Sequence, residues 1–204
     1  MPDNQTFENS TYVPDLGFFV AIIGPSGAGK DTLLALVQES FKNDPRFVFA
    51  KRVVTRQAQG EDHDTLSIEG FLHAQNNGAF CLNWQAHGLY YGLPQQLIDD
   101  LTQGKTVIAN ISRKTLNQCA DKFKNFAIIE ITAQRDILRQ RLKNRGRESN
   151  QDIEQRLLRA SLPFALPSNI LVYPIDNSFA PQHGAAQLQK ILCLLQTNCR
   201  GRTY

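Results

Sequence analysis

The segment Gly24–Thr32 has the residue types and spacing of a phosphate-binding loop. A glycine, four further residues and a Gly-Lys pair stand between an apolar stretch, Phe18–Ile23, and a segment of helical character that begins at Lys30. Glycines let the backbone curl around an oxyanion with its N–H groups turned inward, and the helix N-terminus and the lysine add positive charge. We therefore expect a nucleoside triphosphate to bind here, in contact with Gly24, Pro25, Ser26, Gly27, Ala28, Gly29, Lys30, Asp31 and Thr32.

Asp31 stands where such loops usually carry a serine or threonine whose hydroxyl binds magnesium. Two roles fit this carboxylate, and both can hold at once. It can interact with the positive end of the helix that it opens. It can also ligate Mg²⁺, directly or through water, because hard carboxylate oxygens suit that ion. Thr32, the nearest hydroxyl, lies one position later. We expect Mg²⁺ beside the triphosphate, with Asp31 as its protein ligand.

A strongly basic segment follows at about 135–159. It contains two i,i+4 arginine pairs, Arg135 with Arg139 and Arg141 with Arg145. Like charges on a shared helix face destabilise the helix unless an anion is bound, although basic faces are also often solvated or paired with nearby acids. In phosphoryl transfer, arginines that close over the phosphates supply positioning and charge neutralisation. We expect a helical lid here, with Arg145 and Arg156 nearest to the transferring group.

A polar segment at about 55–93 interrupts the regular pattern of strands and helices, and it indicates an inserted lobe with short strands. Arg56 ends a strand at its start, and Tyr90 and Tyr91 are adjacent near its end. Because neighbouring strand residues face opposite sides, we expect one tyrosine to point inward and the other into a pocket. Arg56 and a phenolic hydroxyl could hold the phosphate of an acceptor. Trp84 is expected in the small core of the lobe.

Elsewhere, short apolar runs alternate with helical patterns, which is typical of an α/β fold with a parallel sheet between helices. The expected strands are Phe18–Ile23, Phe47–Val53, Thr106–Ile111, Phe126–Ile131 and Ile170–Ile175. The expected helices are Lys30–Lys42, Pro94–Gln103, Ser112–Phe123, Arg135–Asn144, Asp152–Ser161 and Pro181–Gln196.

The composition is that of an ordinary globular chain. Its 204 residues fit one domain at 17–204 after a loose polar arm at 1–16, and the net charge of +3 is too mild to indicate nucleic acid. The four cysteines form no C-x-x-C pair, and neither a signal sequence nor a membrane span is evident. We expect a cytoplasmic protein with reduced thiols and no membrane or nucleic-acid partner. The sequence leaves open whether it is a monomer or a homodimer.

Taken together, these residues resemble the guanylate kinase family over nearly the whole chain from Gly17 onward. The resemblance implies a P-loop kinase fold of three layers, with a five-stranded parallel core sheet, an inserted acceptor-binding lobe and an arginine-rich helical lid. The matching pieces occur in order: Gly24–Leu33, Thr55-Arg56 with Gly60-Glu61, His87–Gly92, Val107–Ile111 and Arg141–Leu157.

Several departures from guanylate kinases concern the recognition of guanine. The family has an acidic residue about five positions before the Tyr-Tyr pair, where this chain has Gln85, and a second acid is replaced within Ala109–Ser112. A basic residue expected shortly after Arg56 is absent from Gln57–Gln59, and Leu93-Pro94 replaces small hydroxyl residues. Without carboxylate acceptors the N–H donors of guanine would be left unpaired. The departures therefore disfavour GMP.

The chain is more similar to the ribose 1,5-bisphosphate phosphokinases, guanylate-kinase-like enzymes of phosphonate catabolism. The resemblance implies the reaction of ATP with ribose 1,5-bisphosphate to give ADP and 5-phosphoribosyl 1-diphosphate (PRPP). The segments that carry it are Lys30-Asp31, Val54–Arg56 with Gly60–His63, Trp84–Gly92, Gly146–Ser149 and Asp176–Ser178.

This reaction requires no catalytic base, because the anomeric phosphate of the acceptor is already an anionic nucleophile. The loop and Lys30 would hold the β- and γ-phosphates, and Arg145, Arg156 and Arg147 would close over the transferring group. Arg56 and Tyr91 would anchor the acceptor, with Arg113 as a further candidate for its second phosphate.

Three other functions compete with this one. A guanylate kinase acting on ATP and GMP is the nearest. A non-catalytic guanylate-kinase-like interaction module would tend to lose the loop lysine and the lid arginines, which this chain keeps. A nucleic-acid binder is disfavoured because no stacking aromatic residues interleave the basic segment.

Overall fold

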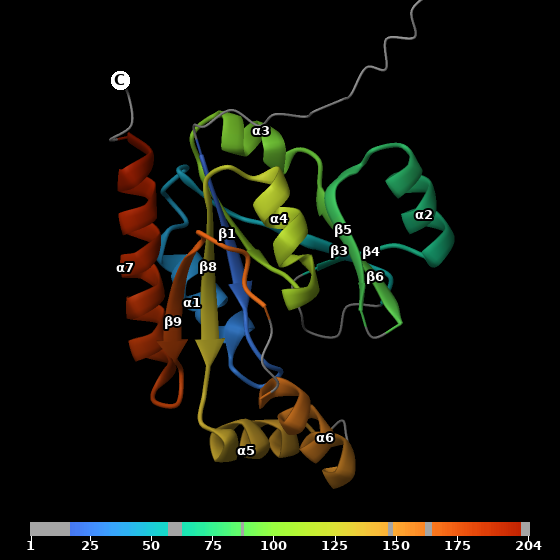
Figure 1. Cartoon of the computed structure of the whole chain (residues 1–204), viewed down its shortest axis with the longest axis vertical. Helices are drawn as coiled ribbons and strands as arrows, with labels where there is room; N and C mark the ends of the chain where they lie inside the picture. The colour runs from blue at the N-terminus through green and yellow to red at the C-terminus, as the bar shows by residue number, and fades with distance from the viewer. Residues whose placement is uncertain (1–16, 57–62, 87, 147–148, 162–164, 201–204) are drawn as a thin grey trace, which may run out of the picture.

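The computed structural model describes residues 17–56, 63–86, 88–146, 149–161 and 165–200. The arm expected at 1–16 lies outside these ranges, as do Gly60–Asp62, His87 and Arg147. Three parts stand out in Figure 1: a core sheet between helices, a lobe on one side, and a pair of lid helices below the sheet.

The core sheet has five strands, all parallel, as expected. In spatial order they are β2 (Phe47–Phe49), β7 (Thr106–Asn110), β1 (Phe18–Ile23), β8 (Phe126–Thr132) and β9 (Leu171–Asp176). Every residue of the central strand β1 is buried. A strand covered on both faces needs apolar side chains at successive positions, which explains the uninterrupted apolar run in the sequence.

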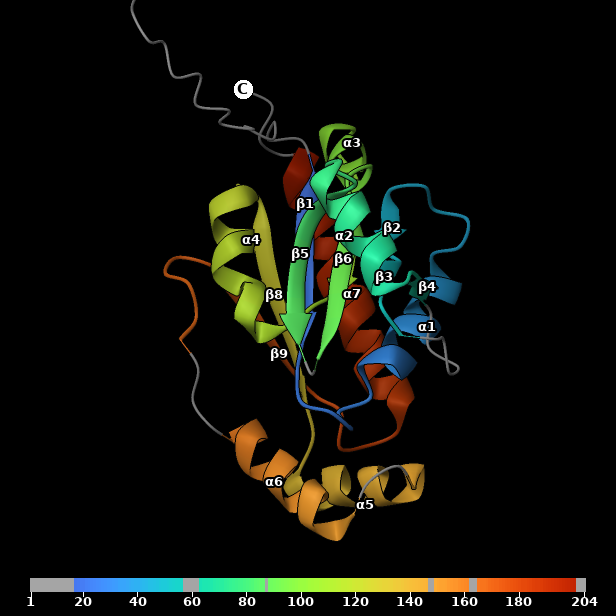
Figure 2. The same ribbon diagram turned by 90° about the vertical axis from the view of Figure 1, so that its right-hand side faces the viewer.

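Helices cover both faces of this sheet, so the fold has three layers (Figures 1 and 2). Alternate residues of β1 enter two separate cores: Val20 and Ile22 face one, and Phe19 and Ala21 face the other. The first core is closed by α1 (Lys30–Ser40) and α7 (Pro181–Arg200). The second is closed by α3 (Leu97–Thr102) and by α4 (Leu116–Lys122), which follows a 3₁₀ turn at Arg113–Thr115.

The expected strand Phe47–Val53 is wrong as a single element. The chain leaves the core sheet after β2, where the Ala50 amide still donates to the Ile108 carbonyl, and it re-enters a second sheet as β3 (Arg52–Val54). Both halves are apolar and extended, so the residue pattern carries no mark of the change of sheet. Only the pairing of β3 with β6 shows it.

The lobe consists of a second, four-stranded sheet and one helix. Its strand order is β4 (His63–Thr65), β3, β6 (Leu89–Pro94) and β5 (Phe80–Ala86). The helix α2 (Ile68–Asn76) was not expected from the sequence, because only one of its side chains, Phe71, is buried. Phe71 stacks on Phe80 at 4.6 Å between ring centroids.

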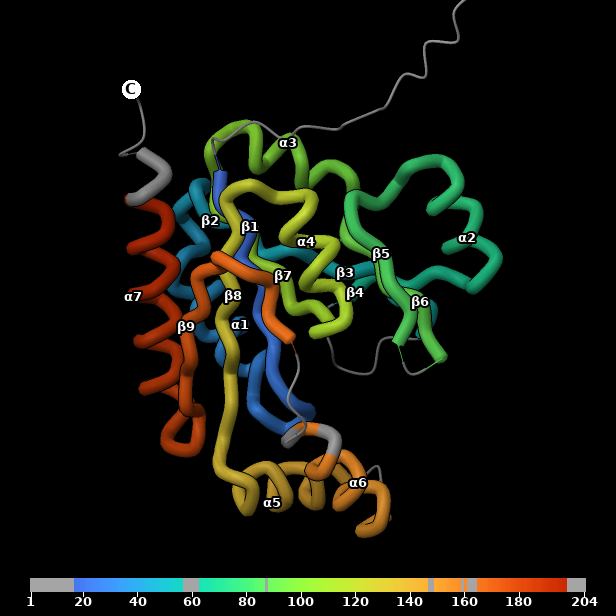
Figure 3. The backbone as a smooth tube through the Cα atoms, in the orientation of Figure 1, coloured from blue at the N-terminus to red at the C-terminus, as the bar shows by residue number. Residues whose placement is uncertain are grey.

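The lid is a helical hairpin beyond the carboxyl ends of the core strands, as the traces of Figures 1 and 3 show. It comprises α5 (Arg135–Arg145) and α6 (Asn150–Ser161), close to the expected bounds. Ser149 and Asp152 form a reciprocal capping box at the start of α6. Leu142 of α5 and Leu157 of α6 belong to the first core, so apolar packing attaches the hairpin to the body of the protein.

No helix in the described ranges is both long enough and apolar enough to cross a membrane.

Candidate active site

The loop between β1 and α1 requires glycine at particular positions. Gly24 has φ +146°, and a Cβ there would lie 2.0 Å from the carbonyl oxygen of Ile131. Gly29 has φ +87°, and a Cβ there would lie 2.4 Å from the Nδ2 of Asn177. Both conformations are accessible to glycine and disfavoured for residues with a side chain. The tight loop predicted from the glycine spacing is therefore supported by the packing of distant segments around it.

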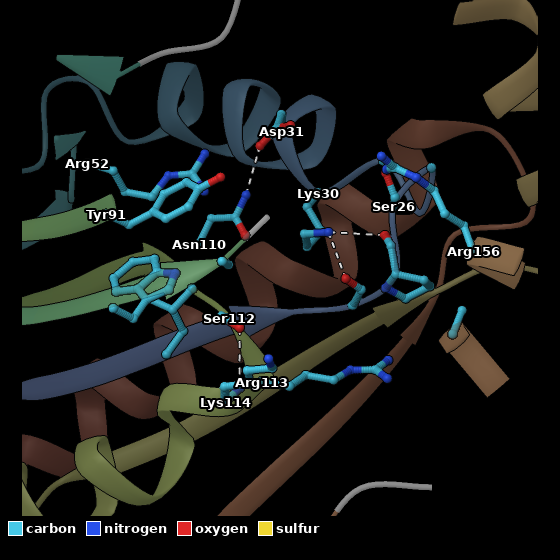
Figure 4. Close-up of a pocket in the computed structure, with 18 of the residues that line it drawn as sticks. Ser26, Lys30, Asp31, Arg52, Tyr91, Asn110, Ser112, Arg113, Lys114 and Arg156 are labelled. Carbon is cyan, nitrogen blue, oxygen red and sulfur yellow. Dashed lines mark hydrogen bonds between the residues drawn. The ribbon is translucent and has the colours of Figure 1, made fainter. Parts of the chain in front are cut away.

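Lys30 is the first residue of α1, and its ammonium group is folded back onto the loop. Its Nζ donates to the carbonyl oxygens of Gly24, at 2.8 Å, and Pro25, at 3.1 Å (Figure 4). Burial lowers the pKa of Lys30 from 10.5 to about 8, and the nearby charge of Asp31 opposes this shift. An anion in the loop would favour the charged form. A phosphate group bound in the loop would therefore be stabilised by the charge of Lys30.

Asp31 lies in the first turn of α1 and accepts a hydrogen bond from the Nδ2 of Asn110, at 2.9 Å. This position agrees with a carboxylate at the positive end of a helix. The described residues contain no cluster of three or more His, Cys, Asp or Glu that could hold a metal by itself. Mg²⁺ is commonly bound by one or two carboxylates together with substrate phosphates. Asp31 beside the phosphate loop fits that requirement.

A cavity of about 660 Å³ opens between the loop, the lobe and the lid. Among the described residues that line it, Asp31 is the single carboxylate, against seven cationic side chains. The cations are Lys30, Arg52, Arg56, Arg113, Lys114, Arg145 and Arg156. Such a one-sided charge distribution concentrates anions and stabilises highly charged ligands.

The lobe contributes aromatic residues as well as cations to this cavity. Tyr91 lines it, whereas Tyr90 turns to the other face of the sheet and packs against Phe71. Trp84 also lines the cavity and stacks on Tyr91, with ring centroids 5.3 Å apart and an angle of 5° between the planes. Trp84 packs against the apolar core that contains Leu82 and Leu93, as expected, but it also lines the cavity, because the register pairs it with Tyr91 on the cavity face.

The lid arginines divide into different groups. Arg145 and Arg156 line the cavity, and Arg156 donates to the hydroxyl of Ser26 at 3.2 Å. Arg135 and Arg139 instead bind Glu154 of α6, and the hydrogen bonds from Arg139 lower the pKa of that carboxyl. The i,i+4 charge repulsion between these two arginines is thus relieved by a protein carboxylate rather than by a ligand.

Arg141 does not line the larger cavity, although the sequence spacing pairs it with Arg145, which does. Its guanidinium group donates to the carbonyl oxygen of Asn177 at 2.9 Å and reaches that of Gly27 at 3.4 Å. It lines a second cavity of about 270 Å³, together with Thr32 and Arg145. Thr32 and Asp31 therefore face different cavities.

Arg113 lines the larger cavity, and its Nη2 also donates to Glu130 at 3.1 Å. Part of its positive charge is therefore balanced by a protein carboxylate rather than by a ligand.

Gln85 is exposed and does not line the cavity, since Trp84 and Ala86 on either side of it occupy the inner face. The position expected to read guanine is therefore directed away from the cavity.

Sequence reasoning missed two cavity cations, Arg52 and Lys114. Arg52 was hidden inside an expected strand, where a charged residue in an apolar run was the only available signal. Lys114 follows Arg113 directly and has no feature of its own in the sequence. Asn177 was noted only as part of a matching segment, and its hydrogen bond to the Ala28 carbonyl could not be expected from the sequence.

Comparison with known proteins agrees with this geometry. The family model described as guanylate kinase matches residues 19–172. A protein of Brucella melitensis named ribose 1,5-bisphosphate phosphokinase PhnN is 46% identical over 145 residues, covering 70% of this chain and 76% of the relative. One of the same name from Agrobacterium fabrum is 41% identical over 175 residues, covering 85% and 94%.

Among solved structures, a guanylate kinase from Anaplasma phagocytophilum superposes with a TM-score of 0.64 over 91% of this chain and 89% of that one. Its identity of 21% supports the fold alone. The two relatives named above support membership of a family as well as the fold, because their sequence identity to this chain extends over most of both chains. The chain therefore belongs to the guanylate kinase family and, within it, to the ribose 1,5-bisphosphate phosphokinases.

Proposed function

We propose that the protein transfers the γ-phosphoryl group of ATP to ribose 1,5-bisphosphate, giving ADP and PRPP in phosphonate degradation. The observation that carries the proposal is the charge of the large cavity, whose described lining has seven cationic side chains and one carboxylate. That carboxylate belongs to α1 at the donor end and is bound to Asn110. Two highly charged substrates fit this cavity, and the names of the relatives agree with the acceptor.

On the donor side, the N–H groups of Gly27, Ala28 and Gly29 and the ammonium of Lys30 would hold the β- and γ-phosphates. Arg145 and Arg156 of the lid would close over the γ-phosphoryl group during its transfer. Bound Mg²⁺ would neutralise charge on the phosphate oxygens, with Asp31 as its protein ligand. These groups act by positioning and electrostatics, which is the main contribution of a protein to phosphoryl transfer.

On the acceptor side, Arg56 and Tyr91 would orient the anomeric phosphate, and Arg113 is a candidate for the second phosphate. An oxygen of the anomeric phosphate forms a bond to the γ-phosphorus as the bond to the bridging oxygen of ADP breaks, and the electron pair leaves with ADP. The nucleophile is already an anion, so no proton has to be removed.

Guanylate kinase activity is the nearest alternative. Recognition of guanine requires acceptors for its N–H donors, and a site that leaves such donors unpaired rejects the base strongly. Among the described residues that line the cavity, Asp31 is the only carboxylate, and it accepts a hydrogen bond from Asn110. The retained Lys30 and lid arginines also disfavour a non-catalytic interaction module.

A coupled assay of ADP release tests the proposal, with ribose 1,5-bisphosphate and GMP compared at equal concentrations. We expect turnover with the sugar bisphosphate and at least ~10²-fold lower kcat/KM with GMP, the scale of discrimination expected when buried polar groups are left unpaired. Phosphorus NMR of the product should show the diphosphate of PRPP. Comparable efficiency with GMP would contradict the proposal.

Lys30→Ala is the matched catalytic control. It should abolish turnover while leaving the circular dichroism spectrum unchanged, because the ammonium contacts only loop carbonyls in the described structure.

We further propose that the enzyme works in the cytoplasm, without a membrane or nucleic-acid partner. Sedimentation analysis would decide between monomer and homodimer.

A further inference from the structure

Arg52 is a cavity cation to which neither the sequence nor the proposed reaction has yet assigned a role. It is the first residue of β3, and its side chain is half-buried. Within the described part of the chain it has no hydrogen-bond or ion-pair partner, unlike Arg56, Arg113 and Arg156. A partly buried guanidinium without a counter-charge is disfavoured unless a ligand supplies one.

The register of the lobe sheet shows which way Arg52 points. Val54 is paired with Tyr91, and Tyr91 is paired with Trp84. Directly opposed residues share a face of the sheet, and so do residues two apart on one strand. Arg52 therefore stands on the face of Tyr91 and Trp84, which is the wall of the cavity.

Arg52 also lies near the point of phosphoryl transfer. Among the like charges that lower the pKa of Lys30, that of Arg52 is the largest, ahead of Arg113 and Arg145. Figure 4 shows Arg52 beside Tyr91 on one side of the cavity, Lys30 toward the middle and Arg156 on the far side. Arg52 and Lys30 line the same cavity, so an anion bound between the lobe and the phosphate loop would be attracted by both cations.

We propose that Arg52 binds the attacking phosphate of the acceptor and holds it toward the phosphate loop. The proposal rests on the proposed function, since it requires an acceptor whose nucleophile is a phosphate. Two anions must meet in this reaction, and the cations at the donor phosphates do not neutralise the incoming one. A guanidinium group on the opposite wall offsets the repulsion, and its planar donors can hold two phosphate oxygens at once.

Arg52→Met and Arg52→Lys test this role against Lys51→Met. Lys51 is the neighbouring cation, and it is exposed and paired with Asp64 at 2.9 Å outside the cavity. With ribose 1,5-bisphosphate, Arg52→Met should lower kcat/KM by about 10²-fold or more, the scale for removing one preorganised donor. The kcat/KM of Arg52→Lys should lie between those of the wild type and Arg52→Met, because lysine keeps the positive charge and loses the planar set of guanidinium donors. Lys51→Met should match the wild type.

Two monophosphates then identify the phosphate that Arg52 holds. Ribose 1-phosphate and ribose 5-phosphate each carry one of the two groups, and each can be measured as a competitive inhibitor. Arg52→Met should raise the inhibition constant of ribose 1-phosphate by at least about tenfold more than that of ribose 5-phosphate. The reverse order would overturn the proposal, because Arg52 would then hold the distal phosphate.

The dissociation constant for ATP separates this role from a structural one. It should be unchanged in Arg52→Met, and an equal loss of ATP affinity would overturn the proposal. A change in kcat/KM of less than about threefold would do the same. If the wild type phosphorylates GMP instead of the sugar bisphosphate, the proposed function fails, and the same variants tested with GMP still decide whether Arg52 binds the attacking phosphate.

Discussion

Asn177, in the turn after β9, donates its Nδ2 to the carbonyl oxygen of Ala28 in the phosphate loop, at 2.8 Å. The side chain is almost fully buried, with 2% of its surface exposed. The backbone carbonyl of the same residue accepts a hydrogen bond from Arg141 of the lid. One buried asparagine therefore joins the phosphate loop, the last strand and the lid.

Asn177→Ala should lower both stability and ATP affinity. The change removes the shorter of two side-chain hydrogen bonds to the carbonyl of Ala28 and leaves only the contact from Arg141 at 3.5 Å, which costs about 1–3 kcal/mol. In a domain of this size the melting temperature should fall by about 2–4 °C per kcal/mol. Asn77→Ala removes a similar side-chain bond, to the carbonyl of His73, at an exposed helix end. Equal effects of the two substitutions on the KM for ATP would contradict the role given to Asn177.

Gly29→Ala should be far more damaging than Gly78→Ala. Both glycines have positive φ, +87° and +71°, so alanine is strained by roughly 1–2 kcal/mol at either position. At Gly29 the new Cβ would also lie 2.4 Å from Asn177, whereas at Gly78 nothing lies within 4 Å. Calorimetric titration with ATP should show lost binding for the first variant and normal binding for the second. Normal binding in both would mean that the loop can shift away from Asn177.

ATP affinity should decrease above pH 8. The pKa of Lys30 is lowered to about 8 by burial, so the ammonium form that binds phosphate is fully present below that pH and is lost above it. Bound phosphate favours the charged form, so binding takes up a proton, and affinity falls by up to about tenfold per pH unit. Titrations between pH 6.5 and 9.5 measure this slope. Lys30→Met should remove it, and an unchanged slope in that variant would assign the titration to another group.

Glu154→Gln should loosen the lid with little change in the rest of the protein. The carboxylate of Glu154 binds both Arg135 and Arg139, which joins α6 to α5. We expect faster hydrogen exchange confined to α5 and α6 and a lower kcat. The pKa of Glu154 is held below its usual range, so the pairing persists at neutral pH and is lost as the pH falls through that lowered value. Glu39→Gln, which breaks an exposed ion pair between Glu39 of α1 and Lys42 just after it, is the control. Equal exchange in the two variants would show that the lid does not depend on Glu154.

The core sheet and the phosphate loop were predictable from the sequence. The bounds of β1 match those expected, and α5 ends at Gly146, whose φ is +60°. The lobe was predicted less well. Its helix α2 buries only Phe71, and the expected strand Phe47–Val53 is divided between two sheets. Burial on one narrow face and a change of pairing partner leave little trace in residue periodicity.

The sequence by itself determined the phosphate loop and the basic lid, because both depend on residues that are neighbours along the chain. Tertiary structure decided the partners of the charged groups. It paired Arg139 with Glu154, placed Arg141 against Asn177 and directed Arg52 into the cavity. An arginine has the same charge in each of these positions. Its role follows from the groups that strand register and helix packing bring to it, and those groups come from distant parts of the chain.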